Sequence, residues 1–210
     1  MIDLNTLLRQ RRSIRKYKET PPPEAWIESL IEAAAWSPSP RNTQPVRFIR
    51  LESAASRQNL QMAMLEGKEL LLTKAAVCNR PKHLRNWINA YWRYSAFMLQ
   101  APVLFAVGTV KPEGGFAHEL RQSGIKTPQK RDDADGDITL GLSLQGFMLQ
   151  AQELGLGTCI LTAPLAFIKT MDKITGAKEI AVKCLVAVGF ADEDPPPPPR
   201  NPLDYIYRRI

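Results

Sequence analysis

The chain has 210 residues, of which 44% are hydrophobic and 23% charged, and this balance excludes an intrinsically disordered protein. A chain of this length can bury a complete core without disulfides or metal, so we expect one globular domain. The net charge of +7 favours phosphate-bearing partners without choosing between nucleic acid, a membrane surface and a phosphorylated cofactor. The three cysteines form no C-x-x-C pair and no apolar stretch is long enough to span a membrane, so we expect a cytoplasmic protein with no membrane contact.

In the first half of the chain, apolar residues repeat mostly at helical spacing. The helix predicted from Glu24 to Trp36 follows three prolines, which suit a first helical turn, and Pro38 and Pro40 end it. Ser53 is the predicted N-cap of a later helix. The predicted elements of this half are a helix over about 4–8, a helix over 24–36, a strand over 46–51, a helix from 53 to about 66 and a helix over 83–100.

The second half begins with a continuous apolar run, P-V-L-F-A-V-G-T, which is typical of a strand buried on both faces. Residues 111–136 are polar and rich in Gly, Asp and Lys, which predicts a loop excursion, and Asp137 then suits the N-cap of the next helix. The predicted elements are strand 102–109, helix 137–154, strand 157–162, helix 164–173, strand 182–190 and a proline-rich tail over 195–210. The order lacks a regular βαβ alternation, so we expect a single α+β domain over residues 1–210, with helices bracketing a central sheet.

Side-chain chemistry of the common enzyme classes is missing from the sequence. His83 and His118 have no partner at metal-ligand spacing, so we expect no metal site. The sequence contains no G-x-S-x-G motif of a serine hydrolase, no P-loop and no G-x-G-x-x-G motif. An enzyme with this sequence would need a cofactor to supply its chemistry, and we expect no catalytic side chain.

The basic run R-R-S-I-R is the strongest local signal. If this segment is extended, Arg11, Ser13 and Arg15 share one face, because side chains alternate along a strand. Two guanidiniums and a hydroxyl that converge on one point form a phosphate clamp. On its own, such a run is more often a solvated basic surface, and a nucleic-acid-binding arm is a second alternative.

The segment S-P-S-P-R-N-T-Q-P, residues 37–45, follows the exit of a predicted helix. Its polar side chains are held in a loop that prolines stiffen, and such a loop can hydrogen-bond a polyol or the edge of a heterocycle with little ordering cost. The alternative is an ordinary turn that ends a helix. The polar residues of this loop are Ser39, Asn42, Thr43 and Gln44.

Four segments, taken in their order along the chain, resemble the FMN-dependent nitroreductase family. They are R-R-S-I-R-K-Y, S-P-S-P-R-N-T-Q-P, L-G-L-G-T-C-I-L-T and the closing R-N-P-L-D. The resemblance implies the nitroreductase-like α+β fold, with a central mixed or antiparallel sheet flanked by helices. It also implies a homodimer that binds FMN at its interface and takes electrons from NADH or NADPH.

The resemblance also implies cofactor contacts for the first and last segments. The residues implied to hold the phosphate and the pyrimidine edge of the flavin are Arg11, Arg12, Ser13 and Arg15. Leu161 and Thr162 match the backbone segment that passes the N5 side of the flavin, and Arg200 matches a late basic residue at the phosphate.

The second segment resembles the loop that the other subunit of the dimer places over the flavin. The matching residues are Pro38, Ser39, Pro40 and Asn42. Gln44, which precedes Pro45, is a weaker candidate for a cofactor contact.

The implied activity is a ping-pong transfer of electrons from NAD(P)H to a small planar acceptor, such as a nitroaromatic, a quinone or an activated alkene. Two alternatives lie inside the family, namely dehalogenation and flavin fragmentation. The alternative outside it is a basic nucleic-acid-binding module, which would leave the second and third segments unexplained. We therefore expect a small-molecule substrate and no nucleic-acid partner.

An aromatic stretch over residues 86–97 places Trp87, Tyr91 and Tyr94 on one helical face. Packing or a subunit interface is the simpler interpretation of this face. The alternative is a lid whose rings stack on a planar substrate.

Overall fold

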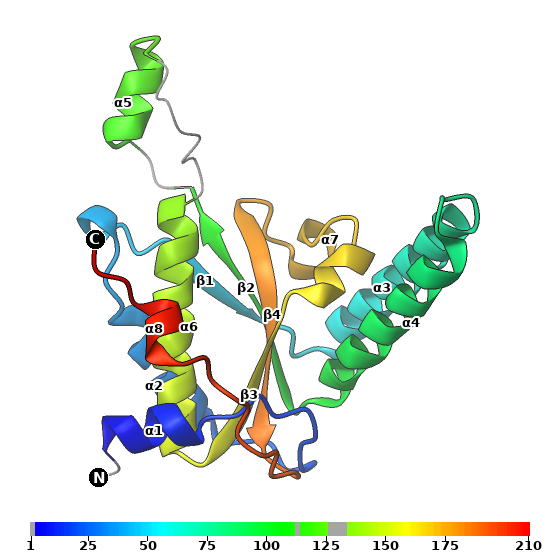
Figure 1. Ribbon diagram of the computed structural model, residues 1–210, viewed down its shortest axis with the longest axis horizontal. Helices are drawn as coiled ribbons and strands as arrows, with labels where there is room; N and C mark the ends of the chain where they lie inside the picture. Colours follow the sequence, from blue (N-terminus) through cyan, green and yellow to red (C-terminus); the bar gives the residue numbers. More distant parts are fainter. Residues whose placement is uncertain (1–2, 112–113, 126–133) are drawn as a thin grey trace.

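The computed structural model describes residues 3–111, 114–125 and 134–210, which fold around one four-stranded sheet (Figure 1). The strands are β1 (Val46–Arg50), β2 (Val103–Val110), β3 (Leu156–Leu161) and β4 (Ile180–Phe190), in the order β1-β2-β4-β3. Every neighbouring pair is antiparallel. The predicted α+β class is confirmed, and the sheet is purely antiparallel.

The first face of the sheet is covered by α2 (Glu24–Ala35) and α6 (Ala134–Glu153), with the short α1 (Leu4–Gln10) beside α6 (Figure 1). Leu30 of α2 and Phe147 of α6 are fully buried in this layer. The ring of Phe147 stacks on Phe48 of β1 at a centroid distance of 5.3 Å, and it meets Phe105 of β2 edge to face at 5.9 Å. These aromatic contacts fix α6 on the sheet.

The second face is covered by α3 (Ala54–Ala76) and α4 (Pro81–Ala96), an antiparallel pair of helices that projects from the body (Figure 1). The short elements η2 (Phe97–Gln100), η3 (Ala163–Phe167) and α7 (Asp172–Thr175) complete this layer. Because helices cover both faces, β2 is buried along almost its whole length, as its apolar run predicts.

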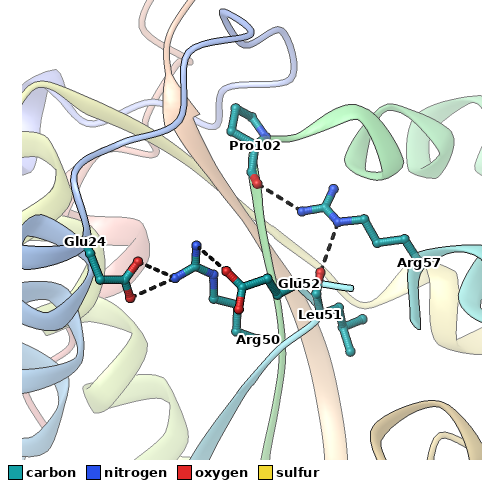
Figure 2. A network of polar contacts seen from close by, with 6 residues as sticks. All are labelled: Glu24, Arg50, Leu51, Glu52, Arg57 and Pro102. Carbon is teal, nitrogen blue, oxygen red and sulfur yellow. Dashed lines mark hydrogen bonds and ion pairs between the residues drawn. The ribbon is translucent and has the colours of Figure 1, made fainter. Parts of the chain in front are cut away.

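Arg57 attaches α3 to the base of the sheet. Its guanidinium donates to the carbonyl oxygens of Leu51 (3.0 Å) and Pro102 (3.0 Å), which Figure 2 shows, and to that of Ala101 (2.6 Å). Burial lowers the pKa of Arg57, and the charge of Arg50 lowers it further. Arg50 itself pairs with Glu24 of α2 at 2.6 Å, so the same corner links both helical layers to β1.

Two predicted helix boundaries are wrong, and each has a local reason. The helix that follows Ser53 continues through Gly67 to Ala76, because Gly67 serves a close packing contact and does not end the helix. A Cβ atom at Gly67 would lie 1.6 Å from the carbonyl oxygen of Phe167. Asp137 is not an N-cap: α6 begins at Ala134, and Asp137 lies in its first turn, where its carboxylate suits the helix dipole and pairs with Lys183 at 3.1 Å.

Three further expectations change in detail. The predicted excursion over 111–136 contains a helix, α5 (Phe116–Gln122), and the start of α6, while its residues 112–113 and 126–133 lie outside the described ones. The helix predicted over 83–100 ends in a 3-10 turn, and the one predicted over 164–173 is two short elements, η3 and α7. The proline-rich tail carries one helical turn, α8 (Leu203–Ile206).

Across the described residues, no helix has the length and apolar character needed to cross a membrane. Cys78, Cys159 and Cys184 are all free thiols.

Candidate functional site

The basic run of residues 11–18 forms an extended strap across the ends of β3 and β4. Ser13 bridges to Thr158 of β3, and the Ile14 N–H donates to the Thr158 carbonyl oxygen at 2.9 Å. Further along, Tyr17 bridges to Ala191, just beyond β4. The segment is therefore extended, as the alternation argument requires, and it joins two strands that lie next to each other in the sheet.

A glycine of the L-G-L-G-T-C segment makes room for this strap. A Cβ atom at Gly157 would lie within 2.7–2.9 Å of three side-chain atoms of Ile14, which is itself buried. Real Cβ atoms do not approach so closely, so only glycine fits here. The first and third sequence segments are thus one packing unit, although about 140 residues separate them in the chain.

Tyr17 fastens the far end of the strap. Its hydroxyl donates to the carbonyl oxygens of Ile14 and, at 3.3 Å, Ala187 of β4. Burial raises the pKa of Tyr17, so the phenol stays protonated and keeps its donor. Sequence reasoning missed this role, because the K-Y pair carries no signal for a contact with residues 170 positions later.

Arginine side chains of the strap cluster at one end of the sheet. Burial lowers the pKa of Arg11, and the charges of Arg200 and Arg12 lower it further, so these guanidiniums lie close together. A groove of about 550 Å³ opens beside them. The groove is lined by Asn5, Leu8, Arg9, Arg12, Pro197, Pro198 and Arg200.

Arg11 and Arg15 also share the neighbourhood of Cys159 on β3. Burial raises the pKa of the Cys159 thiol, and the charges of Arg15 and Arg11 oppose that rise. Leu161, two residues after Cys159, lies on the same face of β3 because strand side chains alternate. Thr162 follows at the exposed end of the strand. The structure therefore brings the strap that carries Arg11, Ser13 and Arg15 alongside β3, the strand that ends at Leu161 and is followed by Thr162.

Arg12 points differently from its neighbours. Its guanidinium donates to the carbonyl oxygens of Arg9 and Arg11, both at the end of α1. Arg9 lies on α1, as expected, and also lines the groove beside Arg12 and Arg200. Arg9 therefore belongs to the cationic cluster, which the sequence did not indicate.

The second candidate segment is an exposed loop that the backbone holds in an unusual shape. Arg41, Asn42 and Gln44 adopt left-handed φ angles of 54°, 53° and 43°. The Ser39 hydroxyl accepts the Gln44 N–H at 2.9 Å, and the Gln44 side chain donates to the Asn42 side-chain oxygen at 3.2 Å. These polar side chains therefore build the loop itself in this single chain.

The two candidate segments lie apart within one chain. The strap follows α1 at the base of α6, whereas the loop of residues 36–44 lies near the other end of α2 and α6, near β2's exit (Figure 1). Pro38, Ser39, Pro40, Asn42 and Gln44 are therefore not brought to Arg11, Arg15 and Leu161 by this chain alone.

The aromatic face of α4 is exposed. Trp87 and Tyr91 stack at a centroid distance of 5.5 Å while about half of each side chain remains open to solvent. Trp92 points the other way and packs edge to face on Phe167 of η3. The face of Trp87, Tyr91 and Tyr94 covers no part of the chain's own core, which leaves both the interface and the lid alternatives standing.

No group of three or more His, Cys, Asp or Glu side chains that could hold a metal ion occurs among the described residues. Those same residues include no buried side-chain nitrogen or oxygen without a hydrogen-bond partner.

The comparisons with known proteins agree with these segments. The model of the "Nitroreductase family" matches residues 8–190, a span that holds the strap, the loop and β3. The putative NAD(P)H nitroreductase YfhC of Bacillus subtilis is 28% identical over 207 residues, covering 95% of this chain and 90% of its own length.

Two solved structures show the same fold. The BluB-like flavoprotein from Clostridium difficile superposes with a TM-score of 0.86 at 24% identity and full coverage of both chains. An iodotyrosine deiodinase bound to FMN and 3-iodo-L-tyrosine superposes with a TM-score of 0.66 at 21% identity, covering 96% of each chain. With a family model that spans residues 8–190, this chain belongs to the nitroreductase family.

Proposed function

We propose that this protein is an FMN-dependent oxidoreductase that passes electrons from NADH or NADPH to a small planar acceptor. The observation that carries the proposal is the strap, which fixes a cluster of guanidiniums beside β3 and a groove of about 550 Å³. The charges of Arg200 and Arg12 add to burial in lowering the pKa of Arg11, so like charges repel here, and a bound phosphate would offset that repulsion. The residues present therefore fit the phosphate end of FMN.

Each residue of this cluster has a distinct task in the proposal. Arg11, Arg12 and Arg200 hold the phosphate, while Ser13 and Arg15 serve the pyrimidine edge of the ring. Leu161 and Thr162 supply backbone on the N5 side. FMN, when bound, supplies the electron-transfer chemistry, and the chain orients it and stabilises negative charge with a nearby cation.

A homodimer is part of the proposal, because the loop is exposed and its backbone is strained in a single chain. Three non-glycine residues in left-handed conformation cost energy, and such strain persists where surrounding structure over-determines it. Trp36 at the start of this loop is 83% exposed, and Ile138 on α6 is 60% exposed. A second copy that covers these apolar side chains would place residues 38–44 over its partner's flavin.

The C-terminal tail supports the same association. Leu203, Tyr205 and Ile206 are all at least 72% exposed, so the tail buries little against its own chain. The outer side of α2 and β1 holds a groove of about 480 Å³ lined by Glu24, Glu28 and Glu32 among apolar residues. The basic and apolar sequence Y-R-R-I that ends the chain is complementary to such a groove on a second copy.

The absorbance spectrum and the mass of the purified protein test both parts. We expect a yellow protein with about one FMN per chain and a dimeric mass by light scattering. Protein that stays colourless after incubation with FMN would exclude the proposal, and a steep salt-dependent affinity for duplex DNA would favour the nucleic-acid alternative. A monomer that retains FMN would exclude the dimer alone.

A second candidate activity is reductive dehalogenation. It is favoured by the likeness to the iodotyrosine deiodinase structure, whose ligand is a halogenated aromatic, and by the exposed aromatic face of α4. Parallel turnover assays with a nitroaromatic, a quinone and 3-iodo-L-tyrosine separate the two. Turnover of the iodotyrosine alone would replace the first candidate by the second.

A further inference from the structure

Glu193 contacts the strap but lies outside the four segments that resemble the nitroreductase family. Glu193 lies shortly after the end of β4. One of its carboxylate oxygens accepts hydrogen bonds from the backbone N–H groups of both Arg15 and Lys16 in the strap. The Lys16 contact measures 3.1 Å. Next to it, the Asp192 N–H donates to the Lys16 carbonyl oxygen at 3.0 Å. Residues 15 and 16 are thus held from both sides by the two residues that precede Asp194.

The charge of Glu193 is opposite to what an anion site needs. Its carboxylate lies close enough to Tyr17 and Cys159 to raise the pKa of each, so it is a near neighbour of the cationic cluster. A negative charge there repels a phosphate and weakens the attraction that Arg11 and Arg15 exert. On charge alone, removing Glu193 would tighten the binding of an anionic cofactor.

The hydrogen bonds act in the other direction. Arg15 is exposed, and within the part of the chain that the structure describes its guanidinium has one hydrogen bond, a long contact of 3.4 Å with the Ser13 carbonyl oxygen. The direction of its side chain is therefore set by the backbone of residue 15, which Glu193 holds. An ordered backbone lowers the entropy cost of aiming a long cation at a ligand.

We propose that Glu193 is a positioning residue for the cofactor site, which fixes the strap backbone at residues 15 and 16 and so keeps Arg15 in place alongside β3. This role rests on the proposed FMN function. Ordering of the strap by Glu193 favours FMN binding by more than the repulsion between its carboxylate and the phosphate disfavours it.

The test compares Glu193→Ala, Glu193→Gln and the control Asp194→Asn. Glutamine keeps an oxygen that can accept the two N–H groups and removes the charge, whereas alanine removes both. The control removes an equal charge from the exposed residue next in the chain. FMN affinity is measured by quenching of flavin fluorescence in the apo-proteins.

We expect Glu193→Ala to weaken FMN binding about ten- to a hundredfold, which is the loss expected if the displaced Arg15 no longer makes its charge-assisted hydrogen bond to the cofactor. Glu193→Gln and Asp194→Asn should stay within about threefold of the wild type. The proposal is overturned if Glu193→Ala binds FMN as tightly as the wild type or more tightly, since the carboxylate then acts through charge. It is also overturned if Glu193→Gln is as weak as Glu193→Ala.

Amide hydrogen exchange in the apo-protein gives a reading that needs no flavin. The backbone amides of Arg15 and Lys16 should exchange at least about tenfold faster in Glu193→Ala and near the wild-type rate in Glu193→Gln. Unchanged exchange in Glu193→Ala overturns the positioning role. Wild-type protein that binds no FMN would instead overturn the proposed function, so the two failures are distinguishable.

Discussion

The strap of residues 11–18 and the loop of residues 36–44 are two parts of one proposed site, and one chain treats them in opposite ways. The strap is pinned to β3, to β4 and to Glu193, and Ile14 is buried at its centre. The loop is exposed and carries three left-handed non-glycine residues, and Ser39, Asn42 and Gln44 hydrogen-bond to one another within it. The strap is held in place by contacts within its own chain, whereas the loop keeps its conformation while it is exposed to solvent.

This contrast teaches how the work of the site is divided. A cation cluster on a rigid strap can take up a phosphate with little reorganisation. The loop keeps a strained backbone conformation, and a partner subunit that covers it would bind a loop that is already in this conformation. Four experiments test whether the two regions differ in this way.

The largest effect is expected at the strap, from Gly157→Ala. The added Cβ would overlap Ile14 and displace the strap, so we expect a loss of about 1–3 kcal/mol in stability and more than about a hundredfold in FMN affinity. Gly155→Ala is the control in the same motif: nothing lies within 4 Å of its Cβ position, and only its φ of +74° is strained. That variant should lose about 1 kcal/mol and keep its FMN affinity. Equal losses of affinity would contradict the packing role of Gly157.

The thiols report on the same contrast in the apo-protein. Burial raises the pKa of Cys159 and raises that of Cys184 to about 12, so at pH 8 neither supplies the thiolate that reacts. Cys78, which is partly exposed at the turn between α3 and α4, should react with a disulfide reagent at least about a hundredfold faster. Cys78→Ser should abolish the fast phase. Fast labelling of Cys159 would mean that the strap does not protect β3.

Single cations of the strap come next. Arg11→Ala and Arg15→Ala should each weaken FMN binding about ten- to a hundredfold, and the exposed Arg200 less. Arg9 lines the groove, so Arg9→Ala should weaken FMN binding slightly, by less than about threefold. Lys178 lies in an exposed turn before β4, and Lys178→Ala should leave the FMN affinity unchanged. A flavin titration at low and high salt checks this order. Equal losses that high salt erases would indicate a diffuse basic patch.

The smallest effect is expected in the loop, and its sign is opposite. Gln44→Gly relieves a left-handed φ of 43°, so the free energy of unfolding of the apo-protein should rise by about 0.5–1 kcal/mol in urea titrations. Thr43→Gly changes a residue with an ordinary φ of −69° and should lower it by about 0.5–1 kcal/mol. If both variants lose stability alike, the loop is unstrained and the contrast with the strap fails.

Local patterns were sufficient to predict much of the fold. The apolar run at 102–109 indicated a strand buried on both faces, and the periodicity of residues 24–36 indicated α2, and both are confirmed. The errors lie where a distant contact overrides a local signal. Gly67 reads as a helix breaker until Phe167 packs on it, and Asp137 reads as a cap until its ion pair with Lys183 is known.

The site was predictable to a smaller extent. The extended conformation that the alternation in R-R-S-I-R requires is present, because that rule needs only neighbouring residues, while the shared face of Arg11 and Arg15 stays a prediction. The residues that hold the strap were missed, since Gly157, Tyr17 and Glu193 act through contacts that span 143 to 178 positions. No spacing rule within one segment could have shown them.

The two bridges that hold the strap join residues that are far apart in the chain, so they can form only after most of the intervening chain has been synthesised. Residues 13 and 17 leave the ribosome long before their partners at 158 and 191. Nascent chains that have not yet reached β4 cannot close this contact, so the cation cluster has no fixed geometry during most of translation. If the chain binds FMN as proposed, it does so late in its synthesis, and a polypeptide truncated before residue 190 should not be rescued by added cofactor.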